Sequence, residues 1–381
     1  MVLSSLRFRV VAAFLVVVAL AGGCRRTADV ITVGVALPLS GSMAEYGQNG
    51  REGITLASEE LDRQPEGRKF RLVYQDTKEA PQETVDAVRR LVDVEGVKFA
   101  IGGLTSSGVL AAAPYAQSHG VLFFTPAASA PGIPQIGNLV FRNWPSDDLI
   151  AKQFGQTVHD KLGVRTVAIL HVSNDYGKVN SEAFATAFEK AGGKVVLTRA
   201  FQQGTTDFKT LLTAAAAIRG LDKIFIIAYP DEYRSIFRQL AVSRLKPGSV
   251  LASDTFFSPR LLSQLGASAQ GVICAVAAKP GPEYQPRQKF IADYRARFKG
   301  PDGKPKDPGL VSDTAYDALH LIAQAINRTD GSPGAVSEWL LQNVKGYPGA
   351  SGPTTFSGIG DVQGELALYE VKAGAFVALG K

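Results

Sequence analysis

Small hydroxyl and glycine residues follow an apolar run near residue 100, in a pattern suited to holding an anion. Residues 97–102 read V-K-F-A-I-G and residues 103–108 read G-L-T-S-S-G. If a strand ends here and a helix begins, the free N–H groups and the dipole at the helix start attract negative charge. Ser106 and Ser107 add hydroxyl donors, each contributing about 1.5–3 kcal/mol when bonded to a charged group. A carboxylate or a phosphate fits this pattern, and a simple helix cap is the alternative.

A second polar segment, residues 125–131 with the sequence T-P-A-A-S-A-P, follows the apolar run at 121–124. Proline disfavours helical backbone in the residue before it, so the two prolines favour an extended loop. The Ala127 carbonyl and the Ser129 hydroxyl then point outward. A ligand-binding loop and a turn without any binding role both explain these residues.

Asp254 begins the sequence D-T-F-F after a short apolar run and could oppose a ligand ammonium. The alternative is an ordinary loop or helix-capping aspartate. Phe256 and Phe257 could line a pocket for a ligand side chain or belong to the core. The segment is therefore a candidate second wall of a binding cleft.

Three tyrosines follow expected strands in comparable places. Tyr46 and Tyr176 each precede a glycine after the first strand of one half of the sequence, and Tyr229 follows a later strand. Tyrosine combines an apolar face with a polar tip, which suits closure over a small polar ligand. A Tyr-Gly dipeptide is common in surface turns, so either one alone is weak evidence. The occurrence of both dipeptides at equivalent positions in the two halves of the sequence is more informative.

The sequence contains no pattern typical of catalysis or of a bound metal. No G-x-G-x-x-G follows the first strand, and no Walker lysine, G-x-S-x-G or H-E-x-x-H motif occurs. The four histidines are scattered, and only His171, which ends an expected strand, could approach a cleft. We therefore expect a protein that is not an enzyme and that holds no metal or cofactor.

The first 23 residues have the features of a secretory signal. Arg7 and Arg9 precede an apolar run over 10–21, which is shorter than the about 20 residues that span a bilayer but suits a signal peptide. The run ends in L-A-G-G-C, which resembles a bacterial lipobox except that Ala21 stands where leucine is usual. We expect removal of residues 1–23, acylation of Cys24 and a tether over 24–30 that holds the protein outside the cell membrane. An ordinary secretory signal with a chance cysteine is the alternative.

The composition argues against two other classes of protein. The chain carries a formal net charge of +6, and its basic residues are interleaved with acidic ones. No basic block with aromatic residues predicts a nucleic-acid partner, and no second long apolar run predicts a membrane span. Cys274 lies in the apolar run 271–276, so we expect a buried thiol and no disulfide framework.

Short β-branched runs alternate with helix-like segments from residue 31 onward, which predicts parallel sheets with helices on both faces. The rhythm restarts near residue 146, where Ser146 suits an N-cap and Asp147 and Asp148 suit the positive end of a helix. We therefore expect an α/β chain with two doubly wound blocks, over about 31–142 and 146–276. The expected strands are 31–37, 71–75, 97–102, 121–124, 167–170, 194–198, 223–227, 250–252 and 271–276.

The last hundred residues continue with helices and then with strands. After K-P-G-P at 279–282, helices are expected near 286–299, 311–328 and 335–343. Residues 358–379 alternate in the manner of antiparallel strands. Since these helices must pack on one of the two blocks, the chain is expected to cross between the lobes more than once.

An ordered set of short motifs spans the chain. In this order the motifs resemble the branched-chain amino-acid binding proteins, which are type I periplasmic binding proteins of ABC importers. The resemblance covers residues 31–381 and implies two doubly wound lobes joined by a multi-strand hinge. It places 31–143 plus 279–347 in lobe 1 and 144–278 plus 348–381 in lobe 2. The motifs are V-G-V (33–35), P-L-S-G (38–41), Y-G (46–47), I-G-G (101–103), S-S (106–107), P-A-A (126–128), F-R (141–142), P-S-D (145–147), D-Y-G (175–177), T-D-F (206–208), S-P (258–259) and Y-D-A (316–318).

The resemblance implies roles for four polar groups of an amino-acid site. Ser106 would bind the ligand carboxylate, and Ser129, in place of the family's threonine, would help to bind both carboxylate and ammonium. The Ala127 carbonyl would accept a hydrogen bond from the ammonium. Asp254 would be the acidic partner of the ammonium, with a shorter reach than the glutamate that the family often has.

The resemblance also implies the surroundings of the ligand. Tyr46, Tyr176 and Tyr229 match tyrosines around it. Leu104 and Thr105 match positions near its side chain, and Thr105 replaces a disulfide cysteine of the family.

The function implied by the resemblance is capture of a small solute outside the cytoplasm. A monomer would bind an amino-acid-like ligand, branched-chain or related, by lobe closure, and deliver it to an ABC permease. A sensing or regulatory protein for another solute, such as an amide, urea or an aromatic acid, stays open as an alternative, and an extracytoplasmic enzyme is a further one.

Overall fold

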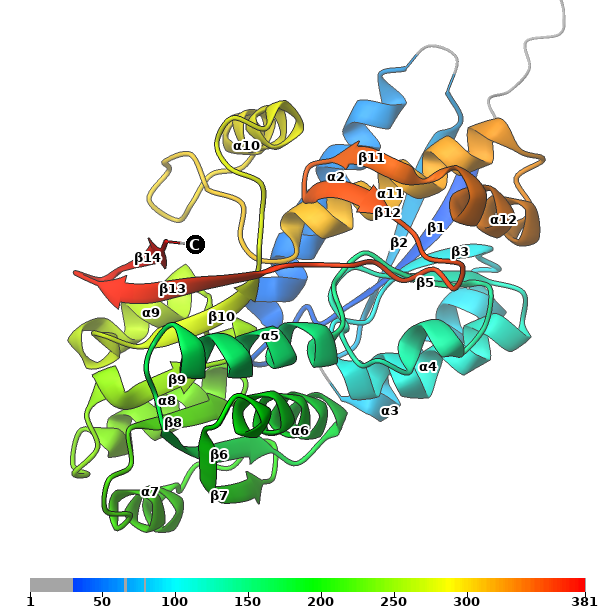
Figure 1. Cartoon of the computed structure of the whole chain (residues 1–381). Helices are drawn as coiled ribbons and strands as arrows, with labels where there is room; N and C mark the ends of the chain where they lie inside the picture. Colours follow the sequence, from blue (N-terminus) through cyan, green and yellow to red (C-terminus); the bar gives the residue numbers. More distant parts are fainter. Residues whose placement is uncertain (1–29, 65–66, 79, 381) are drawn as a thin grey trace, which may run out of the picture.

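The computed structural model describes residues 30–64, 67–78 and 80–380 and has two lobes (Figure 1). Each lobe is built on one sheet of mostly parallel strands with helices on both faces. The expected α/β architecture is therefore confirmed. Every helix within the described ranges is too short or too polar to span a membrane, and the expected signal segment and Cys24 lie outside those ranges.

The first lobe contains a five-stranded parallel sheet in the order β2-β1-β3-β4-β5. Its elements are β1 (Val30–Leu37), α2 (Ala44–Asp62), β2 (Lys69–Asp76), α3 (Pro81–Arg89), β3 (Phe99–Gly102), α4 (Ser106–Ser118), β4 (Leu122–Thr125), β5 (Val140–Arg142), α10 (Gln285–Arg297), α11 (Ser312–Arg328) and α12 (Pro333–Asn343). Strands β3 and β4 are buried at every residue, as strands covered on both faces require. Helix α11 contacts α2 and α12 on one face, and α3 contacts α4 on the other.

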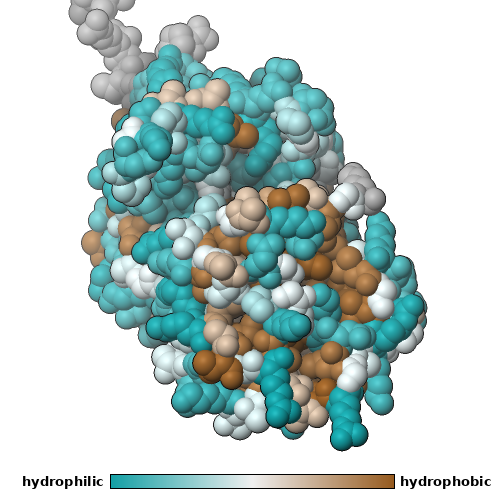
Figure 2. Space-filling view, turned by 90° about the vertical axis from the view of Figure 1, so that its left-hand side faces the viewer, coloured by the Kyte–Doolittle hydropathy of each residue, from teal (hydrophilic) through white to brown (hydrophobic). Residues whose placement is uncertain are grey.

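The second lobe contains a seven-stranded sheet in the order β14-β13-β10-β9-β8-β6-β7. Its elements are α5 (Asp147–Asp160), β6 (Thr166–Val172), α6 (Asp175–Lys190), β7 (Lys194–Phe201), α7 (Lys209–Ala216), β8 (Lys223–Ile227), α8 (Pro230–Leu240), β9 (Val250–Ala252), α9 (Pro259–Leu265), β10 (Ile273–Ala277), β13 (Leu366–Lys372) and β14 (Ala375–Leu379). The hairpin β13–β14 is antiparallel and forms one edge of the sheet. Figure 2 shows apolar side chains gathered on the side of this lobe where the hairpin lies. In the hairpin, Val377 of β14 is 40% exposed.

Three chain segments connect the lobes: one follows β5, one follows β10 and one precedes β13. Before the last crossing, β11 (Lys345–Gly349) and β12 (Gly352–Thr355) pair with each other, and β11 contacts α10 and α11. Phe356 then packs its ring on Phe124 and Phe141 of the first lobe. The segment 348–381, which we expected to belong to the second lobe, is therefore divided, because only β13 and β14 extend the second sheet.

Helices α2 and α11 approach each other closely at Gly53, and this contact yields a first prediction. A β-carbon at residue 53 would overlap the Ser312 carbonyl at the start of α11. We expect Gly53→Ala to lower the free energy of unfolding by about 1–3 kcal/mol, since backbone atoms must move to admit the methyl group. Urea denaturation checks this value.

Gly334→Ala is the matched control, because Gly334 is an exposed residue of α12 and a β-carbon there meets no atom within 4 Å. This change should stabilise the protein by about 0.5–1 kcal/mol through the better helix propensity of alanine. Equal effects of the two substitutions would contradict the close α2–α11 contact.

Candidate ligand-binding site

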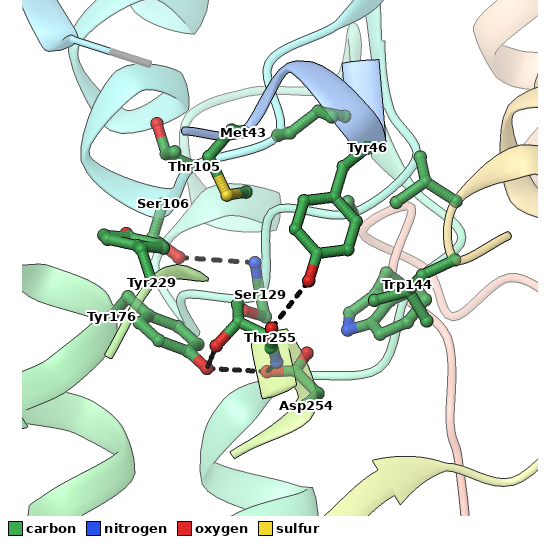
Figure 3. Close-up of a pocket in the computed structure, with 14 residues that line it drawn as sticks. Met43, Tyr46, Thr105, Ser106, Ser129, Trp144, Tyr176, Tyr229, Asp254 and Thr255 are labelled. Atoms are coloured by element: carbon green, nitrogen blue, oxygen red, sulfur yellow. Dashed lines mark hydrogen bonds between the residues drawn. The ribbon is translucent and has the colours of Figure 1, made fainter. Parts of the chain in front are cut away.

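A cavity lies between the lobes, at the carboxyl ends of the sheet strands, where open α/β sheets bind ligands. All nine residues expected around a ligand line it (Figure 3). They are Tyr46, Leu104, Thr105, Ser106, Ala127, Ser129, Tyr176, Tyr229 and Asp254. Five further residues, which the sequence did not single out, complete the wall: Met43, Trp144, Thr255, Leu310 and Val311.

The first lobe contributes a helix start with free donors. Gly103 has a left-handed φ of 68°, a conformation that glycine adopts without strain, and it turns the chain from β3 toward α4. No side chain caps α4, so its first N–H groups remain available. The Ser106 hydroxyl oxygen accepts hydrogen bonds from the N–H groups of Ala130 at 3.1 Å and Ser129 at 3.4 Å. Its own proton is therefore free to bond a ligand anion.

The Ser129 hydroxyl is held in one orientation. It donates to Oδ2 of Asp147 at 2.6 Å, and the Asp147 N–H donates to the Ser129 carbonyl at 2.9 Å. Because its proton is committed to Asp147, the hydroxyl offers the cavity an acceptor. The Ala127 carbonyl lies on the same wall, so this side of the cavity suits a ligand cation.

Asp254 carries the acidic group of the second lobe. The Tyr176 hydroxyl and the Thr255 N–H both donate to its Oδ1, at 2.6 and 2.9 Å. No described residue donates a hydrogen bond to its Oδ2, and the side chain is partly exposed to the cavity. Burial raises the pKa of Asp254. An ammonium group at Oδ2 would satisfy the free acceptor and lower that pKa.

Asp147 lies behind Ser129 and, together with Asp254, lines a second, smaller cavity. Trp144 and Asp254 line both cavities. Burial, followed by the charge of Asp254, raises the pKa of Asp147 to about 7, although hydrogen bonds from Ser129 and Asn180 and the positive charge of Arg142 oppose the shift. Among the described residues, no lysine or arginine lines either cavity.

The tyrosines contribute ring faces and bonds across the cleft. Tyr176 and Tyr229 stack with ring centroids 5.6 Å apart. The Tyr46 hydroxyl, from the first lobe, donates to the Thr255 carbonyl of the second lobe at 2.6 Å. Burial raises the pKa values of Tyr46 and Tyr176 well above their usual range, so both remain neutral donors at neutral pH.

Four apolar side chains complete the walls of the cavity. Met43, Leu104, Leu310 and Val311 line it, and such walls favour an aliphatic side chain by removing it from water. Val311 has a φ of 78°, a strained conformation for a β-branched residue. Such a conformation persists only where the surrounding structure holds it. The position of the Val311 side chain at the start of α11 is therefore fixed.

Several other residues that were considered in the sequence analysis lie away from the cavity. His171 contacts the Val172 carbonyl through Nδ1 at 3.0 Å and does not line the cavity. Phe256 packs on Tyr233 in the core, and Phe257 packs on β13 and β14. Cys274 is a buried free thiol. Within the described ranges, no cluster of three or more His, Cys, Asp or Glu residues could hold a metal ion.

Two hydrogen bonds at the rim of the cleft join the lobes in addition to the Tyr46 bond. Ser107 of α4 donates to Asp175 of α6, and Ser258 at the start of α9 donates to Glu45 of α2, both at 2.6 Å. The lobes are therefore in a closed arrangement.

Ser107→Ala tests the contribution of this rim to closure. Ser107 belongs to neither wall of the cavity, and its bond to Asp175 exists only when the lobes meet. We expect ligand affinity to fall about two- to tenfold, which corresponds to one lost hydrogen bond, with an unchanged free energy of unfolding. Calorimetric titration checks the affinity, and Ser118→Ala, at the exposed end of the same helix, is the control that should leave it unchanged.

Two α/β lobes that close over a cavity lined by hydrogen-bonding groups define a solute-binding protein. The periplasmic binding protein family matches this chain over residues 30–375, so the chain belongs to that family. Its members are solute-binding proteins rather than enzymes and are located outside the cytoplasm. The family and the type I fold expected from the sequence are thus confirmed.

Known relatives match nearly the whole chain. The leucine-, isoleucine-, valine-, threonine- and alanine-binding protein of Pseudomonas aeruginosa is 26% identical over 349 residues, which are 90% of each chain. The Leu/Ile/Val-binding protein of Escherichia coli K12 is 27% identical and covers 93% of this chain and 94% of its own. A leucine-binding protein of Thermotoga maritima aligns with a TM-score of 0.82 at 26% identity, covering 92% and 98%. A Rhodopseudomonas palustris solute-binding protein with bound benzoate has the same TM-score at 18% identity, with 92% and 96% covered, which shows a shared fold alone.

Proposed function

We propose that this protein binds a small amino acid, branched-chain or related, between its lobes and delivers it to an ABC permease. One observation carries the proposal: a free helix start with the Ser106 hydroxyl and the unbonded oxygen of Asp254 line the same cavity. A zwitterion needs an anion-binding group and a cation-binding group at a short separation. The names of the relatives, which bind leucine, isoleucine and valine, support the same ligand class.

Each part of the ligand has a counterpart in the cavity. The carboxylate would take the Ser106 hydroxyl and the N–H groups of α4, which replace the hydrogen bonds lost from water. The ammonium would take the Ala127 carbonyl, the Ser129 oxygen and Asp254. The aliphatic side chain would lie against the leucine and valine side chains of the wall.

Lobe closure would complete the site. Ser106, Ser129 and Ala127 belong to the first lobe, whereas Asp254 and Tyr176 belong to the second. A ligand bound to the first lobe would therefore gain its second-lobe contacts only as the rim bonds form. Hinge closure around a ligand is the mechanism of periplasmic binding proteins in general.

A thermal-shift screen tests the ligand class. Amino acids, amides, urea and aromatic acids, including benzoate, are added one at a time to the purified protein. A true ligand at about 100 times its Kd stabilises the native state by about 2.7 kcal/mol and raises Tm by several degrees. We expect the largest shift from leucine, isoleucine or valine, and shifts from aromatic acids or amides alone would refute the proposal.

We further propose that the mature chain is a monomer tethered to a membrane through acylated Cys24. The L-A-G-G-C sequence supports the tether, because acyl transfer needs a cysteine after small residues at the end of a signal segment. Metabolic labelling with a fatty acid should mark the protein and should fail for Cys24→Ser. Labelling of both forms would contradict this site of attachment.

A further inference from the structure

Two carboxyl groups, those of Asp147 and Asp254, line the smaller cavity, and no lysine or arginine that the structure describes lines it with them. We propose that ligand binding here releases a proton: in the empty site one of these two carboxyl groups keeps its proton, and the ammonium of the ligand displaces it. Only ligands that carry a cationic nitrogen would then bind. The inference rests on the proposed function and adds a chemical condition to it.

Geometry couples the two carboxyl groups to one binding position. Both line the smaller cavity, and Asp254 also lines the larger one. Asp147 is only 5% exposed and reaches the larger cavity through its hydrogen bond from Ser129. A cation placed between Asp254 and the Ser129 oxygen would therefore lie beside one carboxyl group and one hydrogen bond away from the other.

The two cations nearest this pair form their ion pairs with other carboxylates, although the charge of Arg142 still offsets part of the rise in the pKa of Asp147. The guanidinium of Arg142 on β5 donates hydrogen bonds to the Asp361 carboxylate at 2.7–2.9 Å and to the Ala130 carbonyl at 2.9 Å. Lys279, in the segment after β10, lies over the Trp144 ring and pairs with Asp313 at 3.2 Å. Neither side chain lines either cavity.

The remaining titratable groups that the structure describes on the elements around Asp147 bring no cation into either cavity. On α6, Lys178 and Lys190 are exposed to solvent. On its own helix, Asp148 pairs with Lys152 at 2.9 Å. On β13, Glu370 pairs with Lys372 at 2.8 Å. The neighbours of Asp254 are uncharged at neutral pH, and burial raises their pKa values further: Tyr46 of α2, Tyr176 of α6, Tyr233 of α8 and Cys274 of β10. Asn180 of α6 contributes an uncharged amide hydrogen bond.

Two carboxylates that are close together and largely removed from water repel each other, so ionising both costs free energy. One of them therefore retains its proton to a higher pH. The raised pKa of Asp147, about 7, agrees with this view. An ammonium lowers that pKa, so the carboxyl O–H bond breaks, the proton passes to solvent, and the carboxylate and ammonium form an ion pair. By linkage, affinity is constant above the pKa of the empty site and falls up to tenfold per pH unit below it.

Calorimetric titration tests proton release directly. The wild-type protein is titrated with L-leucine, or with the amino acid that gives the largest thermal shift, in buffers of low and high ionisation enthalpy near pH 7. We expect release of about 0.5–1 proton per ligand and an affinity about tenfold weaker at pH 6 than at pH 8. Leucine itself does not titrate in this interval. Equal heats in both buffers with an unchanged affinity would overturn the inference.

Asp147→Asn removes the titrating group but keeps an oxygen that can accept the Ser129 hydrogen bond. We expect this variant to bind with little proton release and with an affinity that no longer changes between about pH 6 and pH 8. Asp148→Asn, the adjacent carboxyl group on the same helix, is the matched control and should behave as the wild type. If Asp147 were merely structural, Asp147→Asn would lower Tm and leave the pH dependence of binding intact.

The two proposals fail in different ways. Absence of binding by any amino acid at about pH 8, where the site is deprotonated, would refute the proposed function. Binding of amino acids without proton release would refute the present inference alone. Benzoate, which lacks an ammonium, should not bind, and benzoate binding as tight as that of leucine would also count against it.

Discussion

Replacing Ser106 and Asp254 together with alanine is expected to abolish amino-acid binding while the fold stays intact. Ser106 offers the free hydroxyl beside the α4 start, and Asp254 offers the unbonded carboxylate oxygen opposite it. Removing one partner of a buried charge pair costs about 2–5 kcal/mol, and a hydrogen bond to a charged group contributes about 1.5–3 kcal/mol. A micromolar ligand has only about 8 kcal/mol of binding free energy. The double variant should therefore bind at millimolar concentrations or not at all.

Calorimetric titration at about pH 8, above the titration of the carboxyl pair, measures this loss without interference from protonation. The control pairs an exposed serine with an exposed aspartate, Ser118→Ala with Asp207→Asn, which lie outside both cavities. An unchanged affinity in the Ser106/Asp254 double variant would disprove the assignment of the site. Circular dichroism must show native secondary structure for the comparison to hold.

The main features of the fold could be predicted from the sequence because parallel strands buried on both faces are continuous apolar runs. The expected strand at 223–227 has the bounds of β8, and the expected strand at 250–252 has those of β9. The pair β11–β12 was not expected, because its sequences K-G-Y-P-G and G-P-T-T contain glycine and proline, which are depleted in strands. Strand β5 has only three residues, too few to show a period.

The polar half of the candidate site was also accessible from sequence, since hydroxyl and acidic residues directly after strands are a local signal. The apolar half was not. Met43, Leu310 and Val311 lie in segments where an apolar residue looks the same whether it faces the core or a cavity, and only tertiary packing separates these cases. Trp144, in a crossing segment, gave no periodic signal either.

Asp147 illustrates a different limit. Its position at the start of α5 suits the helix dipole, as expected, and that local role explains the residue type fully. Its contacts with Ser129 and its approach to Asp254 join segments far apart in the sequence. Ser146 shows the same effect on a smaller scale: it occupies the N-cap position, but its hydroxyl bonds to the Asp148 carboxylate instead of capping the helix.

Arg142→Met is expected to cause the largest loss of stability among the substitutions considered. Arg142 is fully buried and binds both carboxylate oxygens of Asp361, which lies in the last crossing segment. Removing one partner of a buried ion pair costs about 3–5 kcal/mol, because the other charge is left without compensation. The Asp361 side chain is 21% exposed, so partial hydration places the expected loss near 3 kcal/mol. Urea denaturation measures it.

Two comparisons separate this charge effect from a simple loss of packing. Arg295→Met removes an exposed pair with Asp307, and exposed pairs contribute only about 0–1 kcal/mol. Arg142→Met combined with Asp361→Leu removes both charges and should be more stable than Arg142→Met alone, since no unpaired carboxylate remains. A double variant as unstable as the single one would show that the hinge depends on the shape of the arginine rather than on its charge. Because this ion pair fixes the last crossing segment against β5, its loss should also loosen the geometry that holds the two carboxyl groups of the cavity together.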